Sequence, residues 1–573
     1  MHDLVIKGGA IVDGTGEPKF TGDIAVDAGV IAQVGGTAAS ARRVIDARGA
    51  LVTPGWVDVH THYDGQATWD PVLAPSSWHG ATTVVMGNCG VGFAPVRPEH
   101  REAVIELMEG VEDIPGICLH AGLKWDWESF PQYLDALERL PRAIDVAAQL
   151  PHHPLRVYVM GERAIRHEMA SADDIAAMQV LAEEALRAGA FGFTTSRTES
   201  HRTTRGEQVP GRYAAKEELK GIGAALGSVG RGAFGMLSDF EDEVAEFDWI
   251  NEVVKSSGRP LWFLLTDRAS DPERWQRLMA GTRRARAGGA SVRAQVAGRP
   301  VGLILGLTNT LNPFMARPSF AALNGLSHAE RLARLRDPAV RERILAEATA
   351  DTLLASVPPI QRSMATRWDR MYVLGDPPNY EPDASASIAA MAQQAGQSPQ
   401  AFCYDYLTGE DGTRMLFFPV TNYVHGDMGV VHSMITDPDT LLGLGDGGAH
   451  CCVICDSSIP TFMLTHWVRD RTRGPRVPLE WAVKRQTSDN AGYFGFPDRG
   501  RLAPGMKADI NVIDFERLRL HPPKLVHDLP AEGKRLVQQV DGYEAIVVSG
   551  EPVFERGVDT GARPGKLVRA GAR

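Results

Sequence analysis

The stretch PGWVDVHTHYDGQ, residues 54–66, decides the fold prediction because it joins a short apolar run to two histidines. His60 and His62 are separated by one residue, so both imidazoles point to the same side if the run is a strand. Neutral imidazole is the commonest metal ligand in proteins. The stretch therefore favours a strand whose end presents two metal-binding nitrogens; the alternative is that backbone hydrogen bonds satisfy each histidine.

Seven further short apolar runs alternate with helical patterns along the chain. The predicted strands lie at 55–62, 81–90, 155–164, 190–197, 232–240, 259–267, 299–307 and 440–448. Eight strand–helix units predict an α/β fold, a TIM (β/α)8 barrel, in which site residues lie at the carboxyl ends of the strands. Both histidines fall at such an end.

The two ends of the chain carry β-rich runs separated by turn signals. We expect them to form one small β-sandwich domain, built from residues 1–56 and 496–573, around a TIM-barrel domain at 57–495. Helical patterns and a proline-rich segment at about 310–420 exceed what a strand crossover needs. They predict a rim or lid insertion in the barrel domain.

The overall composition favours small-molecule chemistry. The formal net charge is -11 and no basic run opposes it, which argues against a nucleic acid or an anionic membrane as partner. The first residues lack a basic leader, and the apolar runs are shorter than the roughly 18 residues of a membrane span, so we expect a cytoplasmic protein. Six cysteines are sparse for this length and predict reduced thiols; Cys452 and Cys455, spaced as CxxC, are assigned to packing.

Asp446 ends the last predicted strand, in the segment GDGGAH at 445–450. The glycines beside it allow the backbone and a substrate to approach closely. An aspartate before glycine also commonly caps a turn. Combined with the two histidines of the first strand, the position favours a carboxylate that faces them across the mouth of the barrel.

Several motifs resemble one known family. They are KGGAIVDGTGEP at 7–18, PGWVDVHTHYDGQ at 54–66, GATTVVMGNCGVGFAP at 80–95, GDGGAH at 445–450 and LAPGMKADINVID at 502–514. The chain resembles the amidohydrolase superfamily, and within it the D-aminoacylase-like group of N-acyl-D-amino-acid deacylases, over nearly its whole length. The resemblance implies that His60, His62 and Asp446 bind metal, and that Cys89 is a further zinc ligand. A buried, inert thiol is the alternative for Cys89.

The chain also departs from the pattern of this family. The fourth predicted strand has no lysine to bridge two metals, and the fifth and sixth have no histidine. We therefore expect one zinc ion per chain, although another divalent metal would also fit. His201 and His450 are the nearest spare imidazoles: each is a polar loop residue, a ligand or a substrate contact.

Candidate substrate contacts follow the predicted strands. Arg197 and Arg202 lie beside the end of the fourth strand, and their guanidinium groups suit a substrate carboxylate. Glu162 lies at the end of the predicted third strand. The loop after Asp446, GGAHCCVICDSSIPTF, has no arginine or lysine, which favours hydrophobic amides over acidic N-acetyl amino acids.

The expected activity is hydrolysis of a linear amide, an N-acyl-(D-)amino acid or related small compound, by a zinc-activated water, with Asp446 as the catalytic proton shuttle. Two alternatives stay open. One is a cyclic amide, imide or lactone hydrolase of the same superfamily; the other is an inactive barrel with a binding role. Whether the chain forms a homo-oligomer is also open.

Overall fold

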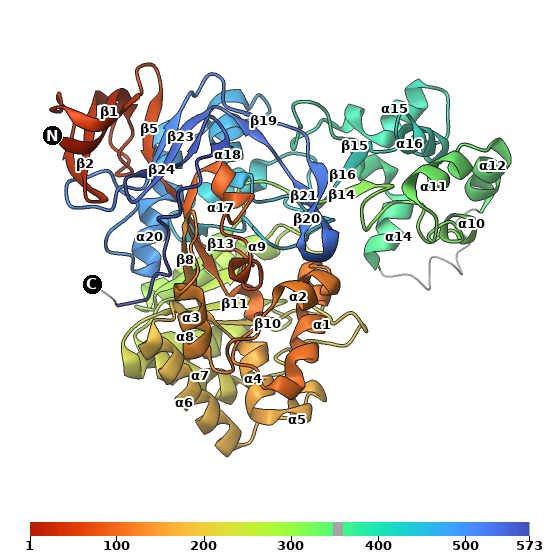
Figure 1. The fold of residues 1–573 in the computed structure, drawn as a ribbon. Coiled ribbons are helices and arrows are strands. Elements are labelled where there is room, and N and C mark those ends of the chain that lie inside the picture. The colour runs from red at the N-terminus through yellow and green to blue at the C-terminus, as the bar shows by residue number, and fades with distance from the viewer. Residues whose placement is uncertain (348–358, 572–573) are drawn as a thin grey trace.

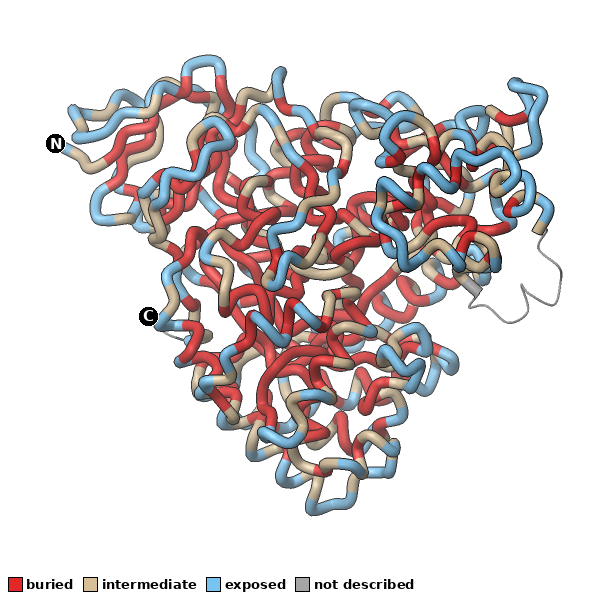
Figure 2. Tube along the Cα trace, turned by 45° about the vertical axis from the view of Figure 1, so that its right-hand side comes forward, coloured by how far each residue is buried: buried red, intermediate tan, exposed pale blue. Residues whose placement is uncertain are grey.

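The computed structural model describes residues 1–347 and 359–571. Figure 1 shows a mixed α/β molecule in which a β-rich region, coloured red and blue, lies beside a body of parallel strands and helices. A lobe of short helices, coloured green and teal, lies at the right of the figure, across the molecule from the β-rich region. Figure 2 shows buried chain inside the lobe as well as inside the body. Within the described ranges, no helix combines the length and apolar character needed to cross a membrane.

The β-rich region is a nine-stranded sheet that both ends of the chain build together. Its strands are β1 (His2–Ile11), β2 (Phe20–Asp27), β3 (Val30–Val34), β4 (Ala41–Asp46), β5 (Leu51–Pro54), β18 (Ile510–Ile513), β23 (Tyr543–Val548), β24 (Glu551–Glu555) and β25 (Val558–Asp559). Strand β5 pairs in parallel with β1 and antiparallel with β18, where Val52 lies opposite Val512. The predicted domain boundaries stay predictions, and residues 572–573 lie outside the described residues.

The body contains two parallel ladders, β6-β7-β8 and β9-β10-β11-β12-β13-β17. Their strands are β6 (Trp56–Asp58), β7 (Ala81–Met86), β8 (Asp145–Ala148), β9 (Leu150–Pro151), β10 (Gly192–Arg197), β11 (Ala233–Ser238), β12 (Leu261–Leu264), β13 (Val292–Val296) and β17 (Thr440–Leu442). A parallel bridge between Thr61 and Gly447 joins the segments that follow β6 and β17. The bridge brings His60 and His62, which follow β6, next to Asp446, which follows β17.

Helices of the body connect the parallel strands or follow β17, the last of them. They are α1 (Arg101–Glu112), α2 (Gly116–Gly122), α3 (Phe130–Glu138), α4 (His152–Met160), α5 (Glu162–Ile165), α6 (Ala172–Ala188), α7 (Lys216–Val229), α8 (Glu243–Ser257), α9 (Arg274–Ala287), α17 (Gly429–Thr436), α18 (Ile459–Phe462), the π-helix η7 (Met463–Asp470), α19 (Leu479–Gln486) and α20 (Ser488–Phe494). Helix α6 illustrates local control, because Ser171 and Asp174 form a capping box at its start and Gly189 ends it with a positive φ.

Two of the eight strands predicted for the barrel do not belong to the parallel ladders. Residues 155–164 lie in α4 and α5, and the consecutive strands β8 and β9 occupy the third place instead. Helix α4 is buried on nearly all sides, so its apolar run gives no helical periodicity. Residues 299–307 form β14 (Val301–Gly306), which pairs antiparallel with β16 (Met415–Thr421) outside the parallel ladders. The seventh position among the parallel strands belongs to β13. Its Arg293 and Gln295 make the segment look too polar in the sequence for a buried strand.

The lobe contains β14, β16 and β15 (Tyr372–Val373) in a three-stranded sheet. Its helices are α10 (Pro318–Ala321), α11 (His328–Leu335), α12 (Pro338–Ala346), α14 (Pro359–Thr366), α15 (Ile388–Gln394) and α16 (Pro399–Thr408). Phe314, Trp368 and Tyr404 belong to a hydrophobic core of its own. Residues 348–358 of the predicted insertion lie outside the described residues. Two antiparallel hairpin pairs, β19 (Arg519–Leu520) with β22 (Val540–Asp541) and β20 (Lys524–Leu529) with β21 (Gly533–Val537), complete the strands.

Candidate metal centre

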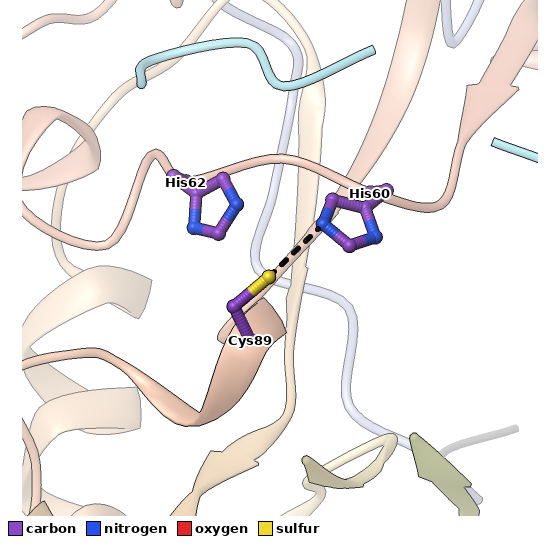
Figure 3. Close-up of side chains that lie close together, drawn as sticks. All are labelled: His60, His62 and Cys89. Atoms are coloured by element: carbon purple, nitrogen blue, oxygen red, sulfur yellow. Dashed lines mark hydrogen bonds between the residues drawn. The ribbon is translucent and has the colours of Figure 1, made fainter. Parts of the chain in front are cut away.

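Three side chains meet at the carboxyl ends of β6 and β7. His60 and His62 follow β6, and Cys89 lies in the 3-10 turn η3 (Asn88–Gly90) that follows β7. One ligand atom from each lies within 4.8 Å of the others, and all three residues are buried. Figure 3 shows the thiol of Cys89 directed at His60, with 3.6 Å between Sγ and Nε2. Nitrogen and sulfur donors so arranged match what zinc prefers.

Asp446 brings a fourth donor to this group. Its Oδ1 lies 3.5 Å from Nε2 of His60 and 3.7 Å from Nε2 of His62. Its backbone N–H donates to the carbonyl of His60 at 3.0 Å, which fixes the loop after β17 against the segment after β6. Asp446 and Cys89 both have positive φ, 44° and 54°. Such backbone in residues other than glycine is costly and concentrates at functional sites.

The electrostatics of the group favour binding of a cation. Burial lowers the pKa of His60 to about 4 and that of His62 well below its usual range, so both rings are neutral and can offer lone pairs. Burial raises the pKa of Asp446 well above its usual range, and the nearby Asp456 and Asp58 raise it further. Among the described residues, only histidines lie within ion-pair distance of Asp446. The donors therefore fit a divalent metal ion, whose charge would offset the buried carboxylate.

Two contacts behind the histidines escaped the sequence prediction. Gln295 of β13 has Oε1 at 2.6 Å from Nδ1 of His60. Glu112, the last residue of α1, has Oε1 at 3.3 Å from Nδ1 of His62. The helical periodicity of α1 could have indicated Glu112. Val104, Met108 and Glu112 are spaced four residues apart, so all three lie on one buried face of the helix. A carboxylate on the apolar face of a helix is unusual and marks a site.

His201 and His450 lie close to the group. Nε2 of His450 is 3.5 Å from Oε2 of Glu112, and burial lowers the pKa of His450 to about 4. Nδ1 of His201 is 2.9 Å from Oγ of Ser196, and burial lowers the pKa of His201 to about 3, with a further lowering from His450. Their roles as ligands or substrate contacts stay predictions.

The remaining predicted contacts point elsewhere. Arg197 pairs with Glu246 at 3.1 Å and also donates to a backbone carbonyl. Arg202 is partly exposed and pairs with Glu199 at 3.2 Å. Glu162 is exposed at the start of α5. The strand end at which we expected it does not exist, because residues 155–164 lie in helices. None of these three has a described contact with the donor group, and their substrate roles stay predictions.

Comparison with known proteins identifies the family. The family model described as "Amidohydrolase family" matches residues 43–554. The chain belongs to the amidohydrolase family. It is 25% identical to the D-aminoacylase of Alcaligenes xylosoxydans xylosoxydans over 99% of this chain and 97% of the relative. The resemblance to the D-aminoacylase-like group is therefore confirmed.

Two solved structures share the fold of this amidohydrolase. One, "The functional role of the binuclear metal center in D-aminoacylase. One-metal activation and second-metal attenuation", has a TM-score of 0.64 at 23% identity and covers 99% of this chain and 100% of the other. The second is an N-acyl-D-glutamate deacylase from Bordetella bronchiseptica complexed with zinc and a phosphonate mimic of the tetrahedral intermediate. Its TM-score is 0.63 at 24% identity, with the same coverage.

Proposed function

We propose that this amidohydrolase uses one zinc ion to cleave the amide bond of an N-acyl amino acid, of D configuration, or of a related small linear amide. The observation that carries the proposal is the buried convergence of His60, His62, Cys89 and Asp446 without an arginine or lysine among their described partners. The names of the related D-aminoacylase and N-acyl-D-glutamate deacylase support the choice of reaction.

The proposed architecture follows from the same contacts. We infer that the two parallel ladders form a single TIM barrel of eight strand positions, in which β8 and β9 share one position. The bridge from Thr61 to Gly447 supports closure between β6 and β17. The sheet from both chain ends would be the β-sandwich domain, residues 1–56 and 496–573, and the residues between would be the hydrolase domain, with the lobe as its rim.

The chemistry divides between the ion and the chain. Bound zinc would polarise the amide carbonyl and lower the pKa of water to about 7. Asp446 would accept a proton from the attacking water and deliver it to the leaving nitrogen as the carbon–nitrogen bond breaks; its position beside both histidines supports this role. Oδ1 of that carboxylate lies 3.5 Å from Nε2 of His60 and 3.7 Å from Nε2 of His62, so one bound ion would be within reach of all three atoms. Burial of His60, His62 and Cys89 limits the access of bulk water to the group and strengthens its electrostatic effect.

The loop after Asp446 guides the choice of substrate. It has no arginine or lysine at 447–462, and Arg197 is bound to Glu246. Arg299 contacts this loop but is already paired with Asp456 at 2.6 Å, so a substrate carboxylate buried beside the loop would have to compete for it or go without a cation, at a cost of several kcal/mol. We therefore favour N-acyl amino acids with hydrophobic side chains over N-acetyl-D-glutamate or N-acetyl-D-aspartate.

A substrate panel tests the proposal. Zinc-loaded protein would be assayed against N-acyl-D- and N-acyl-L-amino acids, cyclic imides and lactones, with Asp446→Asn as the inactive control. We expect turnover of linear hydrophobic N-acyl compounds. Faster turnover of cyclic imides or lactones would favour the alternative hydrolase, and zinc binding without any turnover would favour the binding role. Either result would overturn the proposed reaction.

A further inference from the structure

The carboxyl end of α1 is tied to the loop that carries Asp446. The backbone carbonyl of Glu112 accepts a hydrogen bond from the N–H of His450. The next residue, Asp113, accepts one from the N–H of Cys452 at 3.1 Å through Oδ2. Glu112 itself is only 1% exposed. The helix end therefore holds a buried carboxylate in a fixed place behind the donor group.

That carboxylate lies between two imidazoles. Its Oε1 is 3.3 Å from Nδ1 of His62, and its Oε2 is 3.5 Å from Nε2 of His450. Neither Nδ1 of His62 nor Oε1 of Glu112 has a hydrogen-bond partner among the described residues, although both atoms are buried. Two unsatisfied buried atoms of complementary type so close together are each other's natural partner.

The two metal-binding rings share one arrangement. In each ring, Nε2 faces Oδ1 of Asp446, while Nδ1 faces a side-chain oxygen behind it: Gln295 for His60 and Glu112 for His62. Coordination through Nε2 requires the proton to be on Nδ1, where it needs an acceptor. An oxygen acceptor at that place fixes the tautomer and the ring orientation, and a carboxylate also makes the ring more basic.

We propose that Glu112 is a positioning residue of the metal centre: it holds Nδ1 of His62, aims Nε2 of that ring at the metal, and is itself steadied by His450. The inference rests on the proposed metal-binding function. Glu112 acts through His62 rather than as a ligand, because its Oε1 lies 3.3 Å from Nδ1 of that ring, whereas the Nε2 atoms of both metal-binding rings face Asp446. Its oxygen faces the edge of the ring away from Nε2.

The test measures metal binding rather than turnover alone. Zinc affinity would be determined by competition with a chromophoric chelator for wild type, E112A, E112Q and E381Q. Glu381 is a matched control, because it is also a buried glutamate bonded to a histidine, His466, but has no described contact with the donor group. Absorption spectra of the cobalt-loaded proteins would report the coordination of the ion. Thermal unfolding without metal would report folding of each variant.

We expect E112A to bind zinc about 10- to 100-fold more weakly, with an altered cobalt spectrum. E112Q should fall between E112A and wild type, because an amide oxygen still accepts the Nδ1 proton, and E381Q should bind zinc as wild type does. Since E112A leaves a buried cavity and can fail to fold, E112Q against E381Q is the decisive pair. Wild-type affinity and spectrum in E112Q and E112A would overturn the inference, as would equal losses in both, which would make Glu112 a ligand. Absence of zinc binding by wild type would instead overturn the proposed function.

Discussion

Two buried carboxylates of this protein have opposite electrostatic settings. Asp446 in the candidate metal centre has only imidazoles within ion-pair distance among the described residues, and burial raises its pKa. Glu381 is more deeply buried, yet it pairs with Arg471 through both oxygens at 3.0 Å and with His466 at 2.9 Å. Burial alone would raise the pKa of Glu381, but these partners lower it to about 2. One site carries its cation within the chain, whereas the proposed function gives the other a cation from solution.

Removing the metal should break this comparison most severely. We expect elemental analysis to find about one zinc ion per chain, and dialysis against a chelator to abolish hydrolysis and lower the melting temperature, because only the folded chain presents the donors together. Added zinc should restore both. Two tightly held ions after dialysis without chelator would show that His201, His450 or Glu112 completes a second site.

Replacing the carboxylate of Asp446 tests its chemistry with the ion still available. Asp446→Asn keeps the shape of the side chain and one acceptor oxygen but removes the basic group, so kcat should fall by about 100-fold or more. KM should change far less. Near-normal kcat in this variant would assign Asp446 to a structural turn and place the proton shuttle elsewhere.

The matching change at the compensated site should alter stability instead. The pKa of Glu381 is lowered from an ordinary 4.5 to about 2, so its ionisation stabilises the fold above pH 4.5 and this gain disappears as the pH falls from 4.5 towards 2. The shift corresponds to about 3 kcal/mol. Glu381→Gln should lose about that much unfolding free energy at pH 7, measured by urea denaturation, and much less near pH 3. A pH-independent loss would contradict the assignment.

The smallest effect is expected from a thiol outside the donor group. Cys455 is buried, and burial raises its pKa to about 12, so it is a neutral packing residue. Cys455→Ser should cost about 1 kcal/mol of stability and leave zinc affinity unchanged.

Cys89→Ser, by contrast, should weaken zinc binding strongly because it exchanges a thiolate for a hydroxyl. Equal zinc affinities for these two variants would remove Cys89 from the site.

The residues of the donor group could be predicted because short motifs carry them. His60 and His62 share one strand end, and Asp446 is marked by its glycines. Their partners could not, since Gln295 and Glu112 come from distant elements and reach the site only through packing. The spacing of Glu112 from the buried residues of α1 indicated its position in the sequence. Gln295, in contrast, made β13 look too polar for a buried strand.

The alternation of strands and helices was predicted correctly in outline, but two strands were misplaced for a physical reason. A segment buried on all sides, such as α4, has no polar face to set a period, so an apolar run there fits a strand equally well. The run at 299–307 is a true strand, yet its antiparallel partner β16 lies more than 100 residues further along the chain. Pairing of that kind depends on tertiary contacts that a local pattern does not contain.

The position of β5 affects the order in which a ribosome can complete this protein. Strand β5 ends at Pro54, directly before β6 and the two histidines, yet its partner β18 begins only at Ile510. During synthesis at roughly 5–20 residues per second, one edge of β5 therefore stays open for tens of seconds after its own emergence. An open strand edge attracts other chains. We expect nascent chains stalled before Ile510 to need chaperone protection, and the segment leading into the metal centre to become fixed only when the last strands arrive.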